Sequence, residues 1–181
     1  LNERVGTGRE VERTLLLRAQ LHQRHHGPLC VAHFDAARKA RPNLKLGALL
    51  GLDLVMYVDG RAAVDASYGD AMMGTPWADN AYLWPAYRSR TFVARTNLPT
   101  NTSCRAPGVV QSIHAIECAV DRVSRELRLD PALVRERNFL KVGDATPYGQ
   151  VLEYCSLPSV WARLRRRAGV DARRAAARAF N

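Results

Sequence analysis

The chain lacks clustered cysteines, long apolar runs and a leader-like N-terminus. Its four cysteines are widely scattered, at Cys30, Cys104, Cys118 and Cys155. Zinc and iron–sulfur sites draw on clustered ligands, so we expect reduced thiols and no metal ion held directly by this chain. No apolar run approaches the roughly 20 residues that cross a bilayer, and no apolar stretch follows the charged N-terminus as in a signal peptide. We therefore expect a cytoplasmic protein that does not enter a membrane.

The first residue is Leu1 rather than methionine, and the simplest expectation is that the 181 residues belong to a longer chain. This length is typical of one domain or of one large piece of a bigger domain. Hydrophobic residues make up 47% of the sequence, which is enough to bury a sizeable core and argues against disorder.

Acidic residues are fewer than basic ones, which gives a formal net charge of +10 and suggests nucleic acid as a partner. Much of the excess lies in one alanine-rich stretch, at Arg163, Arg165, Arg166, Arg167, Arg173, Arg174 and Arg178. Arginine and alanine favour helices, and no recognition motif accompanies them. We therefore expect residues 170–181 to form a basic helical tail or linker, and no nucleic-acid partner. A nucleic-acid-binding domain is a rival interpretation, whose binding would weaken steeply as salt rises.

Hydrophobic patterns in the first half of the chain predict both helix and strand. Residues 10–26 contain no proline or glycine and are closed by Gly27-Pro28, which predicts a helix. Residues 29–34 form a short apolar run typical of a buried strand. Aromatic residues among turn formers predict a packed loop over residues 74–85, and residues 87–96 are predicted to form a strand.

A hairpin is predicted in the middle of the chain. Two strand-like segments, residues 52–58 and 61–67, flank the dipeptide Asp59-Gly60. A tight hairpin turn needs positive φ, which glycine adopts readily, so this dipeptide favours two antiparallel neighbours.

The second half of the chain predicts helices. Apolar residues recur every three or four positions from Val109 to Leu127, so one face of that segment is continuously apolar. Asp130 is an N-cap followed by proline, which opens a short helix ending at Asn138. A further helix begins near Ser156 and ends at Gly169. Helices and strands alternate loosely, so the predicted fold class is α/β, with α+β as the alternative.

The segment from Arg95 to Gln111 packs turn formers directly ahead of the predicted Val109–Leu127 helix. A helix N-terminus presents free backbone N–H groups and the positive end of a dipole, which suits an anionic or oxo ligand. Arg105 would add charge-assisted hydrogen bonds there. An ordinary capped turn with an exposed arginine explains the same residues equally well.

The same segment resembles the T-N-x-P-x-N-T-x-x-R-x-x-G-x-x-Q stretch of the xanthine dehydrogenase/aldehyde oxidase family. Further collinear matches support the resemblance, at Trp77 to Pro85, Ala115 to Glu117, Asp130 to Leu140 and Gly143 to Gln150. Several ordered matches are more specific than a single motif. The resemblance implies that this chain is a partial molybdopterin-binding domain.

The resemblance also implies cofactors and site residues. The molybdenum of the molybdopterin cofactor would oxidise an electron-poor carbon, and in the full-length protein the electrons would leave through 2Fe–2S clusters and FAD. Arg105 and Gly6 would contact the cofactor. Glu10 would bind the substrate, although an acidic residue in the first turn of a helix is also favourable without any ligand. The family's catalytic glutamate belongs to a later segment, so we expect no catalytic residue here.

Departures from the family pattern bear on the substrate. Pro107 replaces a ring-stacking phenylalanine of the xanthine enzymes, and Met73 stands where those enzymes carry a substrate-binding arginine. A pocket without that cation would stabilise an anionic purine transition state poorly. Glu10 favours a purine, whereas Met73 and Pro107 favour an aldehyde. The stretch between Leu29 and Tyr57 is also shorter than in the family, through a deletion or a faulty gene model.

We therefore predict a fragment of a molybdenum hydroxylase that oxidises purines, N-heterocycles or aldehydes with water as oxygen donor. The full-length protein is expected to be a homodimer that binds a small-molecule substrate and passes electrons to NAD or oxygen. The fragment alone should be inactive. The alternative is a truncated or degenerate homologue that acts only as an interaction module.

Overall fold

The computed structural model describes residues 13–22, 31–40, 47–63, 65–100 and 102–180. The strands are β1 Arg13–His22, β2 Val31–Ala40, β3 Leu49–Arg61 and β4 Tyr87–Arg95. The helices are α1 Ser67–Gly74, the short 3₁₀ helix η1 Pro76–Asp79, α2 Val109–Leu127, α3 Pro131–Asn138, α4 Leu157–Arg167 and α5 Val170–Phe180. No helix among these residues is long and apolar enough to cross a membrane.

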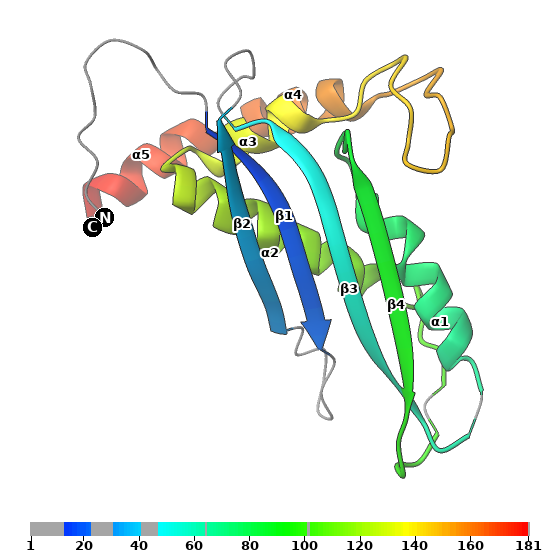
Figure 1. The fold of residues 1–181 in the computed structure, drawn as a ribbon. Helices are drawn as coiled ribbons and strands as arrows, with labels where there is room; N and C mark the ends of the chain where they lie inside the picture. The colour runs from blue at the N-terminus through cyan, green and yellow to red at the C-terminus, as the bar shows by residue number, and fades with distance from the viewer. Residues whose placement is uncertain (1–12, 23–30, 41–46, 64, 101, 181) are drawn as a thin grey trace.

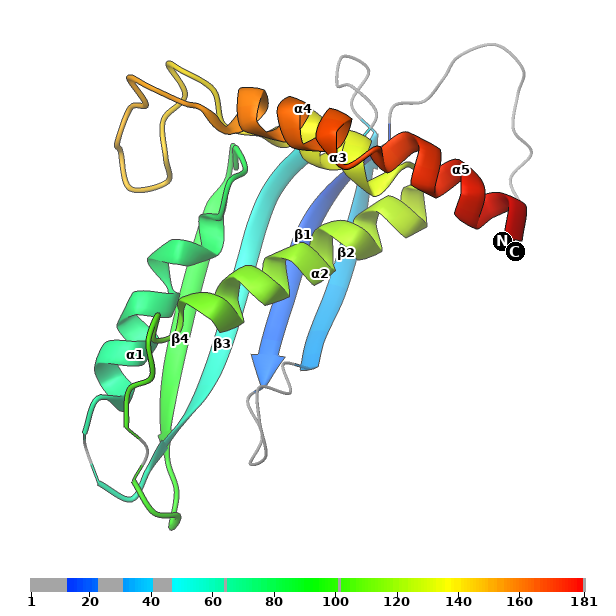
Figure 2. The same cartoon turned by 180° about the vertical axis from the view of Figure 1, so that it is seen from behind.

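The strands form one mixed sheet in the order β2-β1-β3-β4. β1 and β2 are antiparallel, whereas β1 and β3, and β3 and β4, are parallel. Helix α2 crosses one face of the sheet, α1 lies beside β4, and α4 and α5 extend across one end (Figures 1 and 2). The architecture confirms the predicted α/β class.

The predicted helix over residues 10–26 is wrong, because Arg13–His22 is the strand β1. This strand pairs with β2 on one side and β3 on the other. Leucine and alanine favour helices only weakly, and pairing along both strand edges overrides that preference. A run such as Leu15-Leu16-Leu17 is also typical of a strand inside a parallel sheet. The strand predicted over residues 29–34 is confirmed, since β2 spans Val31–Ala40.

The predicted hairpin at Asp59-Gly60 is also wrong, because β3 continues through both residues to Arg61. The register with β4 shifts between Asp59 and Arg61, and the positive φ of 65° falls on Arg61 rather than on Gly60. A Cβ at Gly60 would lie 2.5 Å from Val93 Cγ1. The glycine therefore permits a β-bulge with close contact to β4 instead of a turn. The second strand predicted over residues 61–67 is wrong as well, since β3 ends at Arg61 and helix α1 begins at Ser67.

The predicted helices are confirmed in the second half of the chain. The apolar face of α2 is buried, with Ile116 and Val120 fully covered, and packs in one core with Leu52 and Leu54 of β3. Burying such a side chain stabilises the fold by about 1.5–3 kcal/mol. Asp130 caps α3 by accepting a hydrogen bond from the Ala132 N–H at 2.8 Å.

Asn138 joins the end of α3 to the beginning of β3. Its side-chain oxygen accepts a hydrogen bond from the Leu49 N–H at 2.8 Å. Its side-chain nitrogen donates to the carbonyls of Gly47 and Val134, at 2.8 and 2.7 Å. The amide is buried, and these bonds use its oxygen and both its N–H donors.

Asp79 is the last residue of η1, and only 5% of its surface is exposed. Burial raises the pKa of its carboxyl from 3.8 to about 6, although backbone hydrogen bonds oppose part of that rise. The folded state therefore holds a proton that the unfolded chain releases between about pH 4 and 6. Stability from this group is present below pH 4 and is lost as pH rises through 6.

We predict that Asp79→Asn removes this pH-dependent loss. Because a shift of about two pKa units corresponds to about 3 kcal/mol, the variant's free energy of unfolding should gain up to that amount on the wild type between pH 4 and 7. Urea unfolding at several pH values measures the difference. Asp65→Asn, at an exposed carboxylate, is the control and should show no such gain. An Asp79→Asn profile parallel to that of the wild type would contradict the prediction.

Candidate functional site

The candidate site lies where the segment after β4 returns to begin α2. Its first residue is tied to the end of β3: the Thr96 hydroxyl donates to the Asp59 carboxylate at 2.7 Å, and the Thr96 N–H to the Arg61 carbonyl at 3.3 Å. Further along, the Ser103 hydroxyl donates to the carboxylate of Asp70, on α1, at 2.5 Å. The segment is therefore fastened to β3 at one end and to α1 near the other.

Two left-handed residues set the beginning of α2. Ala106 has a φ of 59°, and Gly108, at the N-cap, has a φ of 70°. A Cβ at Gly108 would clash with the carbonyl oxygen of Asp70, and a Cβ at Gly74 would lie 2.9 Å from the carbonyl oxygen of Gly108. Only glycine at both positions lets α1 and α2 approach this closely. We call this contact the Gly74–Gly108 junction.

Three of the predicted site residues lie within three positions of a junction glycine in the sequence. Arg105 is exposed, two residues before Pro107, and Pro107 directly precedes Gly108. Met73 directly precedes Gly74 and is 44% exposed on α1. The fold thus brings Met73 of one helix to the same junction as the arginine segment, although more than thirty residues separate them in the sequence. Gly6 and Glu10 lie outside the described residues, so their roles stay predictions.

The first turn of α2 contains an unusual polar group. The side-chain oxygen of Gln111 is buried and has no hydrogen-bond partner among the residues that the structure describes. No side chain caps the helix at Gly108, among the residues that the structure describes. A buried acceptor without a partner is costly, so a donor from outside the described residues would be favoured there. In the described ranges, no three His, Cys, Asp or Glu side chains are grouped to hold a metal ion.

A polar network that the sequence analysis did not find holds α2 in place. The carboxylate of Glu117 accepts hydrogen bonds from the Asn80 side chain and the Tyr82 hydroxyl, each at 2.7 Å, and from Arg135 Nε at 2.8 Å. Arg135 also pairs with Asp121 at 2.8 Å. The three segments that meet here all lie within family-like motifs, and this resemblance was the one sequence feature that could have pointed to the network. Nothing in their spacing showed that they are in contact.

The chain is similar to known proteins over most of its length. The family model described as the molybdopterin cofactor-binding domain matches residues 6–139. Aldehyde oxidase 1 of Oryctolagus cuniculus is 34% identical over 135 residues, which are 75% of this chain and 10% of that protein. Xanthine dehydrogenase 1 of Arabidopsis thaliana is 34% identical over 119 residues, which are 66% of this chain and 9% of that protein. The chain thus spans about a tenth of the length of these relatives.

A solved structure is similar as well. The aldehyde oxidoreductase of Desulfovibrio gigas matches with a TM-score of 0.57 and 29% sequence identity, over 61% of this chain and 12% of that protein. The sequence and structure comparisons therefore agree on the kind of domain to which these residues correspond.

The Gly74–Gly108 junction can be tested by one substitution. We predict that Gly108→Ala strongly destabilises the protein, because the new Cβ meets the backbone of Asp70 and the φ of 70° is unfavourable for alanine. The loss should exceed 2 kcal/mol, roughly the range of strained or overpacked sites. Thermal unfolding measures it.

Gly69→Ala is the matched control for this substitution. Gly69 lies within α1 and a Cβ there would meet nothing within 4 Å. Alanine has a higher helix propensity than glycine, so the control should be as stable as the wild type or more stable by up to about 1 kcal/mol. Equal unfolding temperatures for the two variants would show that the close approach at Gly108 is not required.

Proposed function

Because this chain belongs to the molybdopterin cofactor-binding domain family, we propose that it is part of a molybdenum hydroxylase that oxidises aldehydes, N-heterocycles or purines with water as oxygen donor. The observation that carries the proposal is the Gly74–Gly108 junction, which brings the family's arginine segment and Met73 together at the N-terminus of α2. Electron transfer through 2Fe–2S clusters and FAD to NAD or oxygen, a homodimeric state and a cytoplasmic location belong to the same proposal.

The residues at the junction fit the cofactor. When bound, molybdopterin supplies the metal chemistry that oxidises the substrate carbon, and the protein supplies position and electrostatics. Within the described part of the chain, the buried Gln111 oxygen is an acceptor without a partner, which suits an N–H donor of a pterin. The uncapped first turn of α2 and the exposed Arg105 suit the anionic parts of the same group. The described residues would thus hold one edge of the cofactor, and other parts of the protein the remainder.

Met73 supports an uncharged substrate over a purine. Its side chain is apolar and partly exposed beside the junction, so it supplies no positive charge to an anionic transition state. In an aldehyde, negative charge develops on the carbonyl oxygen and not over a purine ring, so a cation beside such a ring is not needed. We therefore place aldehydes first among the proposed substrates.

The overall proposal is tested on the intact protein. We expect elemental analysis to find molybdenum bound stoichiometrically, and isotope-labelled water to supply the oxygen of the oxidised product. Residues 1–181 expressed alone should bind no molybdenum, because the described residues contribute only part of the site. An intact protein without molybdenum would favour the alternative that it is an interaction module, and stoichiometric metal on the fragment would overturn its partial role.

The substrate preference is tested by Met73→Arg. We predict that an arginine here raises the ratio of kcat/KM for xanthine to kcat/KM for an aromatic aldehyde by at least about tenfold, equivalent to about 1.4 kcal/mol of transition-state stabilisation. Met72→Arg is the matched control, because Met72 is the neighbouring residue on α1, is 54% exposed and receives the same charge. An equal change in both variants would mean that general surface charge, and not position 73, sets the preference.

A further inference from the structure

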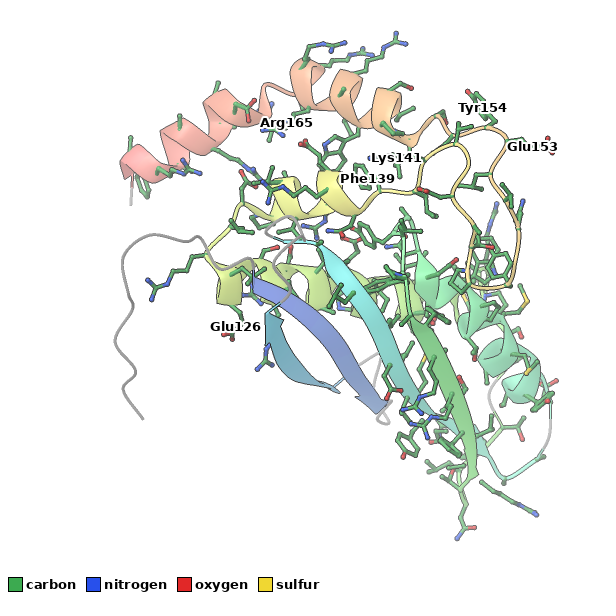
Figure 3. The ribbon with its side chains drawn as sticks, turned by 45° about the horizontal axis from the view of Figure 1, so that its top comes forward. Glu126, Phe139, Lys141, Glu153, Tyr154 and Arg165 are labelled. Carbon is green, nitrogen blue, oxygen red and sulfur yellow. The ribbon has the colours of Figure 1, made fainter. Side chains whose placement is uncertain are left out.

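A cavity lies between the last three helices, and its lining includes neither glycine of the Gly74–Gly108 junction. It has a volume of about 390 Å³, is open to solvent, and is lined by the end of α3, Lys141, α4 and the beginning of α5. Figure 3 shows Phe139, Lys141 and Arg165, which line it, between α3 and α4. We call it the α3–α4 pocket. Neither Arg105 nor Met73 lines it.

Aromatic rings form the apolar wall of the α3–α4 pocket. Phe139 and Trp161 pack edge to face with their ring centroids 5.2 Å apart. The indole N–H of Trp161 donates to the carboxylate of Glu136 at 2.6 Å, so its polar atom already has a partner. Phe139 is only 6% exposed and stacks on Tyr82, so Trp161 supplies most of the carbon surface, which favours a flat aromatic ligand through stacked or edge-to-face contact.

Basic side chains outnumber acidic ones in the lining of the pocket. Arg165 pairs with Glu136 at 2.5 Å and with Asp171 at 2.7 Å, which uses both lining acids. Lys141 and Arg166 also line the pocket and are exposed, and in the described part of the chain neither side chain pairs with an acid. The lining therefore carries an excess of positive charge beside an aromatic wall.

We propose that the α3–α4 pocket binds a small planar aromatic anion, such as an aromatic carboxylate, sulfonate or phosphate. Its ring would pack against Phe139 and Trp161, and its anionic group would pair with Lys141 and Arg166. The volume falls within the range of about 300–1,000 Å³ typical of small-molecule sites. The proposal is independent of the molybdenum site, because it uses none of the junction residues.

The test measures binding of naphthalene-2-sulfonate to the intact protein by isothermal titration calorimetry. We expect the anion to saturate one site in the α3–α4 pocket. The affinity of this site should fall at least about tenfold in the double variant Lys141→Glu/Arg166→Glu, because two attractive charges become repulsive. The neutral naphthalene-2-sulfonamide and the non-aromatic cyclohexanesulfonate should each bind more weakly, because each lacks one of the two features.

Arg163→Glu/Arg167→Glu is the matched control, because it reverses two exposed arginines of the same helix that do not line the pocket. It should leave the affinity within about twofold of the wild type. The circular dichroism spectrum and the rate of aldehyde oxidation should be unchanged in both double variants. Failure of the pocket proposal can therefore be told apart from failure of the proposed oxidation. Equal weakening by the two double variants, tighter binding of cyclohexanesulfonate or absence of a saturable site would each overturn the proposal.

Discussion

The fold depends on the half-buried carboxylate of Glu117, which joins three separate segments. Its oxygens accept hydrogen bonds from Asn80 and Tyr82, in the segment after η1, and from Arg135 of α3. Burial raises the pKa of the Tyr82 hydroxyl, and the adjacent Glu117 carboxylate raises it further, so the hydroxyl stays protonated and donates. Removing one partner of such a network leaves the others unsatisfied, which commonly costs several kcal/mol. The network therefore fixes where α2 lies relative to its neighbours.

The position of α2 in turn determines the candidate site. A helix is a stiff element, so a shift at Glu117 would move its first residue, Gly108, against the backbone of α1. That contact allows no room for adjustment, since a Cβ at Gly74 would already lie 2.9 Å from the Gly108 carbonyl oxygen. Arg105 and Gln111 each lie three residues from Gly108, so the placement of Gly108 also determines where they lie. The Glu117–Arg135 ion pair near the middle of α2 and the residues at its N-terminus are thus linked through one rigid helix.

Local patterns predicted the parts of this arrangement whose causes are local. The apolar periodicity over residues 109–127 and the N-cap at Asp130 depend on near neighbours, and both helices formed as expected. The predicted helix over residues 10–26 was wrong because β1 owes its conformation to pairing with strands distant in sequence. The hairpin turn predicted at Gly60 was wrong for the same reason, since the close contact of Gly60 is with the distant strand β4. The contacts of Glu117 required knowledge of which segments meet, which spacing along one chain does not contain.

The strong positive charge of the chain has a more specific arrangement than composition suggests. Arg174 of α5 pairs with both oxygens of Asp130, at 2.7 and 2.6 Å, although Asp130 also caps α3. Arg165 similarly bridges Glu136 of α3 and Asp171 of α5. These arginines act as ties that hold the last two helices against α3, because few apolar side chains of α5 are covered. Two arginines of the basic stretch, Arg165 and Arg174, thus have a structural use, and the α3–α4 pocket exists because their ion pairs hold the helices around it.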